Sequence, residues 1–101
     1  MRPRAPPPTS VAAYRELLRK VDEELIALYA ERRALVRQLW EFKALEGLPL
    51  VDPVQEQRVV TRARARAIEV GLEPDEGERL VRWILTEGRR GLPRAVTPPP
   101  R

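Results

Sequence analysis

The sequence of 101 residues contains no cysteine, no histidine and no asparagine. The missing cysteine and histidine exclude thiol nucleophiles, disulfides, imidazole acid or base catalysis and zinc sites of the usual kind. We therefore expect no metal and no cofactor. Any activity must come from arginine, lysine, carboxylate and amide groups.

Long apolar runs are also missing. No stretch approaches the ~20 apolar residues of a membrane span. The first ten residues, MRPRAPPPTS, lack the apolar segment of a signal peptide. We expect no membrane association and a cytoplasmic location.

Proline gathers at both ends of the chain, and these stretches show no core-forming pattern. Residues 1–10 and 93–101 are predicted to be disordered proline-rich tails, because such segments favour the extended polyproline conformation. They flank one predicted helical domain at residues 11–92.

The net charge of +4 arises in the tails. Four of the 19 basic residues lie there, whereas all 15 acidic residues lie between Glu16 and Glu87. The predicted domain therefore carries no net charge, which argues against a nucleic-acid-binding protein.

The dominant feature is residues 14–43, which contain neither glycine nor proline. Apolar residues recur there every three or four positions, as in a long helix with one apolar stripe: Leu18, Val21, Leu25, Leu28, Leu35, Leu39 and Phe42. A helix of roughly 45 Å is too long to bury this stripe against its own short chain. A second copy of the chain is the simplest cover, so we expect a homodimer.

Two shorter helices are expected after the long one, and no strand. Gly47 is a stop signal for the first helix, and Asp52 followed by Pro53 is a typical helix start. The second helix is predicted to end at Gly71 and the third to begin at Pro74. The predicted fold class is all-α, with one long and two shorter helices.

Arg32 occupies the position in the apolar stripe between Leu28 and Leu35. A buried arginine needs an anion, because desolvating an unpaired charge costs several kcal/mol. Lys43 is predicted on the same helical face, about 16 Å further along. The two cations could hold a small dianion. In a simpler alternative, they pair with protein carboxylates such as Glu56, on the apolar face of the second helix.

The second helix also carries Arg58, Arg62, Arg64 and Arg66 on its other face. Such a cluster is compatible with polyanion binding. Because the domain has no net charge, we expect a solvated face instead.

The pattern resembles the all-helical (type II) chorismate mutases over residues 15–92. The matching pieces, in order, are RELLRKVDEELIAL from Arg15, AERRALV around Arg32, FKALEGLPLVDP with Lys43 and Asp52, then Glu56 and GLEPDEGERLVRWIL. The resemblance implies three helices per chain intertwined in a homodimer with two active sites. It also implies the isomerisation of chorismate to prephenate in aromatic amino-acid biosynthesis.

The resemblance also implies the roles of individual residues. Arg15 would cross from the partner chain to bind a substrate carboxylate beside Arg32. Lys43 would contact the other carboxylate and the ether oxygen. Asp52, through its backbone, and Glu56 would hold the ring hydroxyl. The catalytic residues would be Arg32, Lys43 and Glu56.

Three positions depart from the family pattern. Gln55 stands where the family usually has an arginine, and Gly88 and Leu92 stand where it has a serine and a glutamine near the end of the third helix. Arg89 and Arg90 are candidates to replace the lost donor if the end of this helix is shifted.

These departures keep two alternatives open. One is a weak or non-catalytic helical dimer that serves as a regulatory partner. The other is a related mutase or lyase that acts on isochorismate or aminodeoxychorismate.

Overall fold

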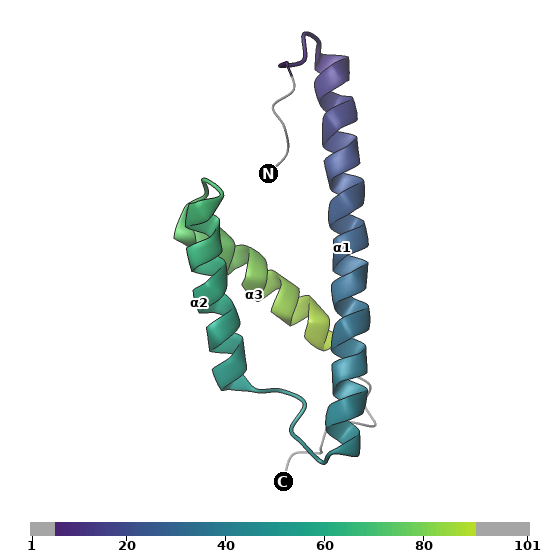
Figure 1. Ribbon diagram of the computed structural model, residues 1–101, viewed down its shortest axis with the longest axis vertical. Helices are drawn as coiled ribbons and strands as arrows, with labels where there is room; N and C mark the ends of the chain where they lie inside the picture. Colours follow the sequence, from purple (N-terminus) through teal and green to yellow (C-terminus); the bar gives the residue numbers. More distant parts are fainter. Residues whose placement is uncertain (1–5, 91–101) are drawn as a thin grey trace. The chain divides into compact units, whose positions relative to one another are not determined.

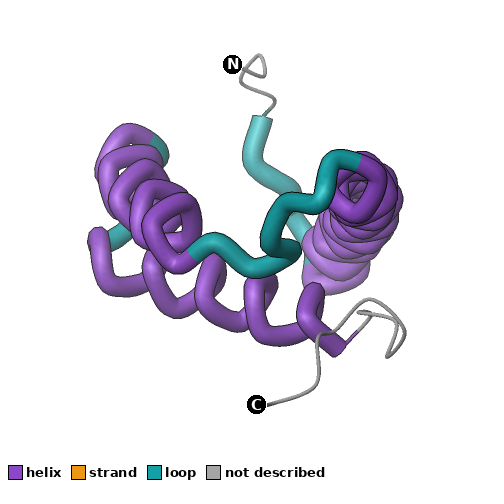
Figure 2. The backbone as a smooth tube through the Cα atoms, turned by 90° about the horizontal axis from the view of Figure 1, so that it is seen from below, coloured by secondary structure: helices purple, strands orange, loops and turns teal. Residues whose placement is uncertain are grey.

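The computed structural model describes residues 6–90, and this part of the chain is entirely helical apart from its turns and links (Figures 1 and 2). The helices are α1 (Val11–Leu45), α2 (Pro53–Glu69) and α3 (Pro74–Arg90). The predicted all-α class and the order of one long and two shorter helices are confirmed for these residues. The chain divides into two compact units within α1, between Ala34 and Leu35. Residues 1–5 of the first predicted tail, Leu92 and all of the second predicted tail lie outside the described residues.

Local signals explain both ends of α1. The Ala13 amide donates to Ser10 Oγ at 3.1 Å, so Ser10 caps the helix. At the other end Gly47 has φ 68°, a left-handed conformation that glycine adopts at little cost. The Leu48 amide then donates back to the Lys43 carbonyl at 2.8 Å, which satisfies a carbonyl at the helix end.

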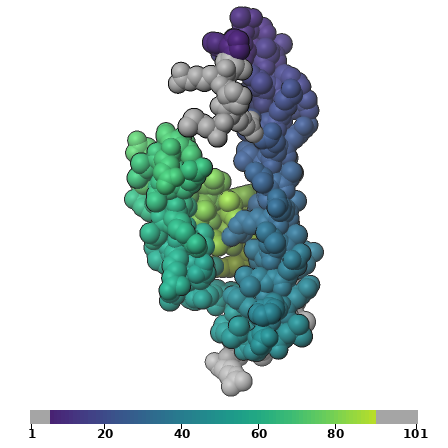
Figure 3. All heavy atoms as spheres, in the orientation of Figure 1, coloured from purple at the N-terminus to yellow at the C-terminus, as the bar shows by residue number. Residues whose placement is uncertain are grey.

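The apolar stripe of α1 remains uncovered in the single chain. None of the helix residues is buried, and the seven apolar residues of the stripe leave 40% to 61% of their surface exposed. Figure 3 shows the side chains of this helix at the surface. The helix propensity of its residues and its capped ends determine where α1 forms. Most of its apolar surface is available for a partner.

Capping also defines the start of α2. Asp52 adopts an extended conformation, and its Oδ1 accepts the Gln55 amide at 3.1 Å. Pro53 occupies the first turn, where a missing N–H is harmless. The predicted helix start is confirmed, and it puts Glu56 in the first turn of α2.

The start of α3 is capped in a similar way. Pro74 opens the helix, and the Glu73 amide donates to Glu76 Oε1 at 3.2 Å. Asp75 and Glu76 lie in the first turn, where negative charge is favourable. The predicted stop at Gly91 lies outside the described residues.

α2 and α3 pack against each other around Gly77. This glycine is buried together with Val60 and Ala67. A Cβ atom on Gly77 would lie 2.5 Å from the Ala63 carbonyl oxygen and 2.8 Å from Ala67 Cβ. The two helices are therefore closer here than any larger residue would allow.

Ion pairs beside this contact define an antiparallel arrangement. Arg64 Nη1 near the end of α2 contacts Asp75 Oδ1 at 2.7 Å and Glu78 Oε1 at 2.9 Å near the start of α3. Arg82 also contacts Glu78, at 2.7 Å. The contacts of Glu78 with Arg82 and then Arg64 lower the pKa of this carboxyl.

Some apolar residues of the short helices remain exposed. Val81, Ile84 and Leu85 are partly buried, but Leu80 is 57% exposed and Val70 is 53% exposed. Leu80 lies off the covered side of α3, since Ile84 and Leu85 further along the helix are still partly buried, and Val70 follows the last residue of α2 as its C-cap.

Gly77→Ala tests the close approach. The added methyl group clashes with the backbone of α2, and overpacking of this kind typically costs about 1–3 kcal/mol. We expect a lower melting temperature than in the unchanged chain, measured by circular dichroism. Arg79→Ala, at an exposed position of the same helix, is the control and should change stability by less than about 0.5 kcal/mol. A higher melting temperature for Gly77→Ala, as expected for an exposed helical glycine, would contradict the proposed packing.

Candidate active site

The two expected arginines of α1 lie in the first unit. Arg15 is exposed near the start of the helix, and Arg32 is partly buried. Neither forms an ion pair or hydrogen bond with the rest of residues 6–90. Both guanidinium groups are therefore available to an anion from outside the described chain.

Lys43 lies in the last turn of α1, in the second unit. Its ammonium group is partly buried and donates to the Leu50 carbonyl at 3.3 Å. A carbonyl is not a counter-ion, and the bond leaves two further donors on the ammonium group. The alternative that Lys43 is paired with a protein carboxylate finds no support among the described residues.

Asp52 and Glu56 are positioned by the first turn of α2. The Asp52 side chain is occupied by the Gln55 amide, and its carbonyl accepts the Glu56 amide at 3.0 Å. Glu56 lies one turn before Val60, which is buried against α3. The Glu56 carboxylate therefore points toward α3 and is only 26% exposed.

The partner of Glu56 is Arg89. Arg89 Nη2 contacts Glu56 Oε1 and joins the start of α2 to the last turn of α3. The alternative that Glu56 neutralises Lys43 is thus wrong for the described chain, where Glu56 pairs with Arg89. Of the two arginines considered as replacement donors, Arg90 contacts Glu87 at 3.5 Å instead.

A groove surrounds the Glu56–Arg89 pair. It encloses about 220 Å³ between α2 and α3 and is lined by Pro53, Gln57 and Val60 on one side and by Arg82, Leu85 and Thr86 on the other. Its walls are both apolar and charged, which suits a small polar ligand. The structure thus brings Glu56 together with Arg89, one of the two arginines considered as replacement donors.

The positions that depart from the family pattern add little to this groove. Gln55 is exposed and Gly88 has no side chain to contribute. Leu92 lies outside the described residues. Of these two positions, only position 55 can therefore supply a hydrogen-bond donor, which is the side-chain amide of Gln55.

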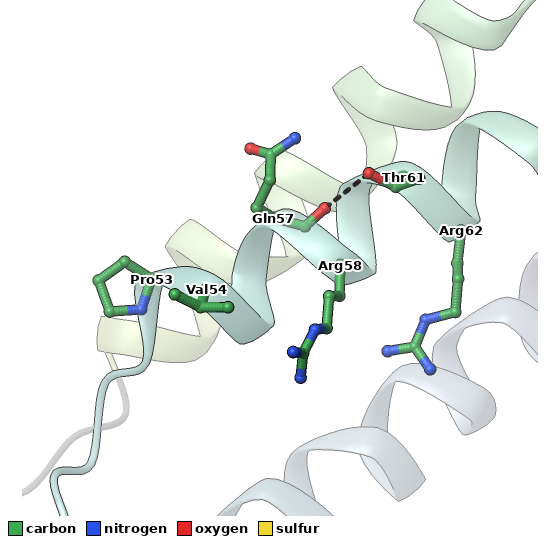
Figure 4. Close-up of a pocket in the computed structure, with 6 residues that line it drawn as sticks. All are labelled: Pro53, Val54, Gln57, Arg58, Thr61 and Arg62. Carbon is green, nitrogen blue, oxygen red and sulfur yellow. Dashed lines mark hydrogen bonds between the residues drawn. The ribbon is translucent and has the colours of Figure 1, made fainter.

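A second hollow lies along α2 and is lined by residues of this helix alone (Figure 4). Pro53 and Val54 form one end, and Arg58 and Arg62 extend from the same side of the helix. Thr61 is occupied by a hydrogen bond of 3.0 Å to the Gln57 carbonyl. This hollow is wide open and contains none of the residues expected at the site.

The arginines of α2 do not form one free basic face. Arg64 is paired with α3, and Arg66 contacts Glu69 at 2.8 Å. Only Arg58 and Arg62 lack such partners among the described residues. This arrangement supports the expected solvated face over a polyanion-binding surface.

The described residues also lack two features of other kinds of site. Residues 6–90 contain no group of three or more acidic side chains placed to hold a metal ion. No helix in that part of the chain has the length and apolarity needed to cross a membrane.

Comparison with known proteins extends over nearly all of the helical region. The sequence profile described as chorismate mutase type II matches residues 14–90. The T-protein of Enterobacter agglomerans is 32% identical over 77 residues, which are 76% of this chain and 21% of that protein. The T-protein of Haemophilus influenzae is 34% identical over 67 residues, which are 66% of this chain and 18% of that protein.

A shorter relative matches along most of its length. The chorismate mutase of Methanocaldococcus jannaschii is 28% identical over 82 residues, which are 81% of this chain and 82% of that protein. The chain therefore spans about a fifth of the two T-proteins but most of the archaeal protein. From the match over residues 14–90, the chain belongs to the type II chorismate mutase family.

Proposed function

We propose that this chain is a chorismate mutase that converts chorismate to prephenate as a homodimer in the cytoplasm. The family match over residues 14–90, which includes Arg15, Arg32, Lys43, Asp52 and Glu56, is the observation that carries the proposal. The supporting structural facts are the unpaired guanidinium groups on α1 and the uncovered apolar stripe of the same helix.

The reaction suits the residues that this chain possesses. Chorismate rearranges within one molecule: a carbon–oxygen bond breaks while a carbon–carbon bond forms, with no covalent intermediate. The protein has to hold the substrate in a reactive chair and stabilise negative charge on the ether oxygen. Fixed cations can do both, so the missing histidine and cysteine are no handicap.

In the proposed site, the cations bind the substrate carboxylates and the carboxylate of Glu56 binds the ring hydroxyl. Arg32 binds one substrate carboxylate, and Lys43 binds the other while donating to the ether oxygen. The bond from Lys43 to the Leu50 carbonyl holds the ammonium group in place and leaves two donors for substrate. Glu56 accepts a hydrogen bond from the ring hydroxyl, and the backbone of Asp52 helps to hold the same group.

The dimer is proposed because α1 cannot complete its surface or the site alone. A helix of 35 residues is about 52 Å long. Arg15 and Arg32 are about 25 Å apart along it, so they cannot reach one small ligand from the same chain. A second chain beside the apolar stripe covers that stripe and delivers its Arg15 to the site.

Loss of the α1 cations tests the catalytic proposal. We expect the unchanged protein to convert chorismate to prephenate, with the product identified by mass and absorbance. Arg32→Ala and Lys43→Ala should each lower kcat/KM by about 10²-fold to 10³-fold, because each removes a fixed charge from the transition state. Arg33→Ala, at the exposed neighbouring position, is the matched control and should retain activity.

The substrate that is turned over and the product that forms distinguish the proposed function from its alternatives. Turnover of isochorismate or aminodeoxychorismate in preference to chorismate would replace the proposed substrate. A protein that neither turns over chorismate nor gains thermal stability from a transition-state analogue would be the non-catalytic dimer, which the missing side chain at Gly88 favours.

Complementation between two inactive variants tests the shared site. Arg15→Ala and Arg32→Ala chains, unfolded together and refolded in equal amounts, form mixed dimers in which one site has both arginines and the other has neither. Random pairing should restore about one quarter of the unchanged activity. Each variant refolded alone is the control. No recovery in mixtures shown by sedimentation to contain dimers would contradict the sharing of Arg15 across chains.

A further inference from the structure

The register of α2 and α3 makes the Glu56–Arg89 contact a consequence of the packing at Gly77. From Gly77 to Arg89 is twelve residues along α3, and from Ala67 back to Glu56 is eleven residues along α2. At about 1.5 Å per residue the two paths are nearly equal, roughly 18 Å and 17 Å. With Gly77 seated on Ala67, the antiparallel helices place Glu56 and Arg89 at the same level.

The two helices lie against each other near the turn that joins them and separate toward the start of α2 and the end of α3 (Figure 1). The groove described above occupies this wider end. A long side chain is needed to bridge it, and Arg89 reaches across to Glu56 while remaining 49% exposed.

The contact leaves Glu56 with acceptor capacity. Arg89 uses Oε1, and an ionised carboxylate offers about four acceptor positions on its two oxygens. Oε2 has no hydrogen-bond partner among the described residues. Arg89 thus fixes one oxygen of Glu56 and leaves the other for a donor from a ligand.

The neighbouring arginines of α3 cannot do the same. Arg82, which lines the same groove two turns earlier, is bonded to Glu78 at 2.7 Å. Arg90 turns to Glu87. Arg89 is therefore the cation of α3 that acts on Glu56.

We propose that Arg89 is a positioning residue of the active site, which holds the Glu56 carboxylate so that Oε2 accepts the ring hydroxyl of the substrate. The inference rests on the proposed function. It assigns to the last turn of α3 a role that works through Glu56 and needs no side chain at Gly88. Because the ring hydroxyl takes no part in the bonds that change, its hydrogen bond is similar in the bound substrate and the transition state. Arg89 therefore contributes mainly to KM.

A double-mutant cycle on the full chain tests this role. The four proteins are the unchanged chain, Arg89→Gln, Glu56→Gln and the double variant. We expect Arg89→Gln to raise KM about tenfold with kcat changed less than about twofold. In the Glu56→Gln background the same substitution should have almost no further effect, because the residue through which it acts is already altered.

Two further variants complete the experiment. Arg89→Lys restores the charge without the planar guanidinium and should recover part of the lost affinity. Arg79→Gln, at an exposed position of α3 outside the lining of the groove, is the matched control and should leave KM unchanged. Melting temperatures of all variants report any loss of folding.

The outcomes are distinct. An equal effect of Arg89→Gln with and without Glu56 would overturn the inference, because Arg89 would then act independently of Glu56. A lower kcat and melting temperature at unchanged KM would show a purely structural role and would also overturn it.

If the unchanged protein shows no turnover, the proposed function fails, and the cycle is measured instead as the Kd of a transition-state analogue by calorimetry. Coupling between Arg89 and Glu56 in that Kd would support the positioning role in a binding site without catalysis. Independent effects, or no binding of the analogue, would overturn it.

Discussion

The contact of Gly77 with Ala63 and Ala67 is the constraint on which the second unit depends. A hydrogen in place of a methyl group lets α3 approach the backbone of α2, and the two helices then have a single register. The ion pairs of Arg64 with Asp75 and Glu78 lie beside this contact and stabilise the same register. Eleven or twelve residues further on, that register brings Glu56 to Arg89. A packing detail near one end of the helix pair thus determines the charge arrangement at the other.

α1 depends on a different constraint. Its ends are capped by Ser10 and by the turn at Gly47, but its apolar stripe contacts little of its own chain. Exposed apolar area of this extent is costly in water, at roughly 25 cal/mol for each Å². The same helix carries Arg15 and Arg32, two cations too far apart to share a ligand in one chain. The proposed pairing of two copies would resolve both problems at once and would link assembly to catalysis through one helix.

Much of this could be predicted from the sequence because it depends on local rules. The ends of the helices follow from Asp52 with Pro53, from Gly47 and from Gly71, each acting on its immediate neighbours. The partner of Glu56 could not be predicted in this way, since it depends on the register between two helices. The signal that was available is Gly77, a glycine inside a helical pattern, which often marks a close approach. The exposure of Leu80 has the same origin, because the covered face of α3 is set by that approach and not by hydrophobicity alone.

A site built on charge, as proposed for this chain, tolerates changes in the positions of its charged groups. A site that uses histidine or cysteine needs one atom in one place, whereas electrostatic stabilisation depends on the sum of charges around the reacting atoms. Gln55 removes a cation from the start of α2, and Gly88 removes a donor from α3. Arg89, one residue from Gly88, is ion-paired with Glu56 and so fixes the residue proposed to hold the ring hydroxyl. Because a guanidinium is long and always charged, the last turn of α3 can contribute through Arg89 even where its nearer positions carry no polar side chain.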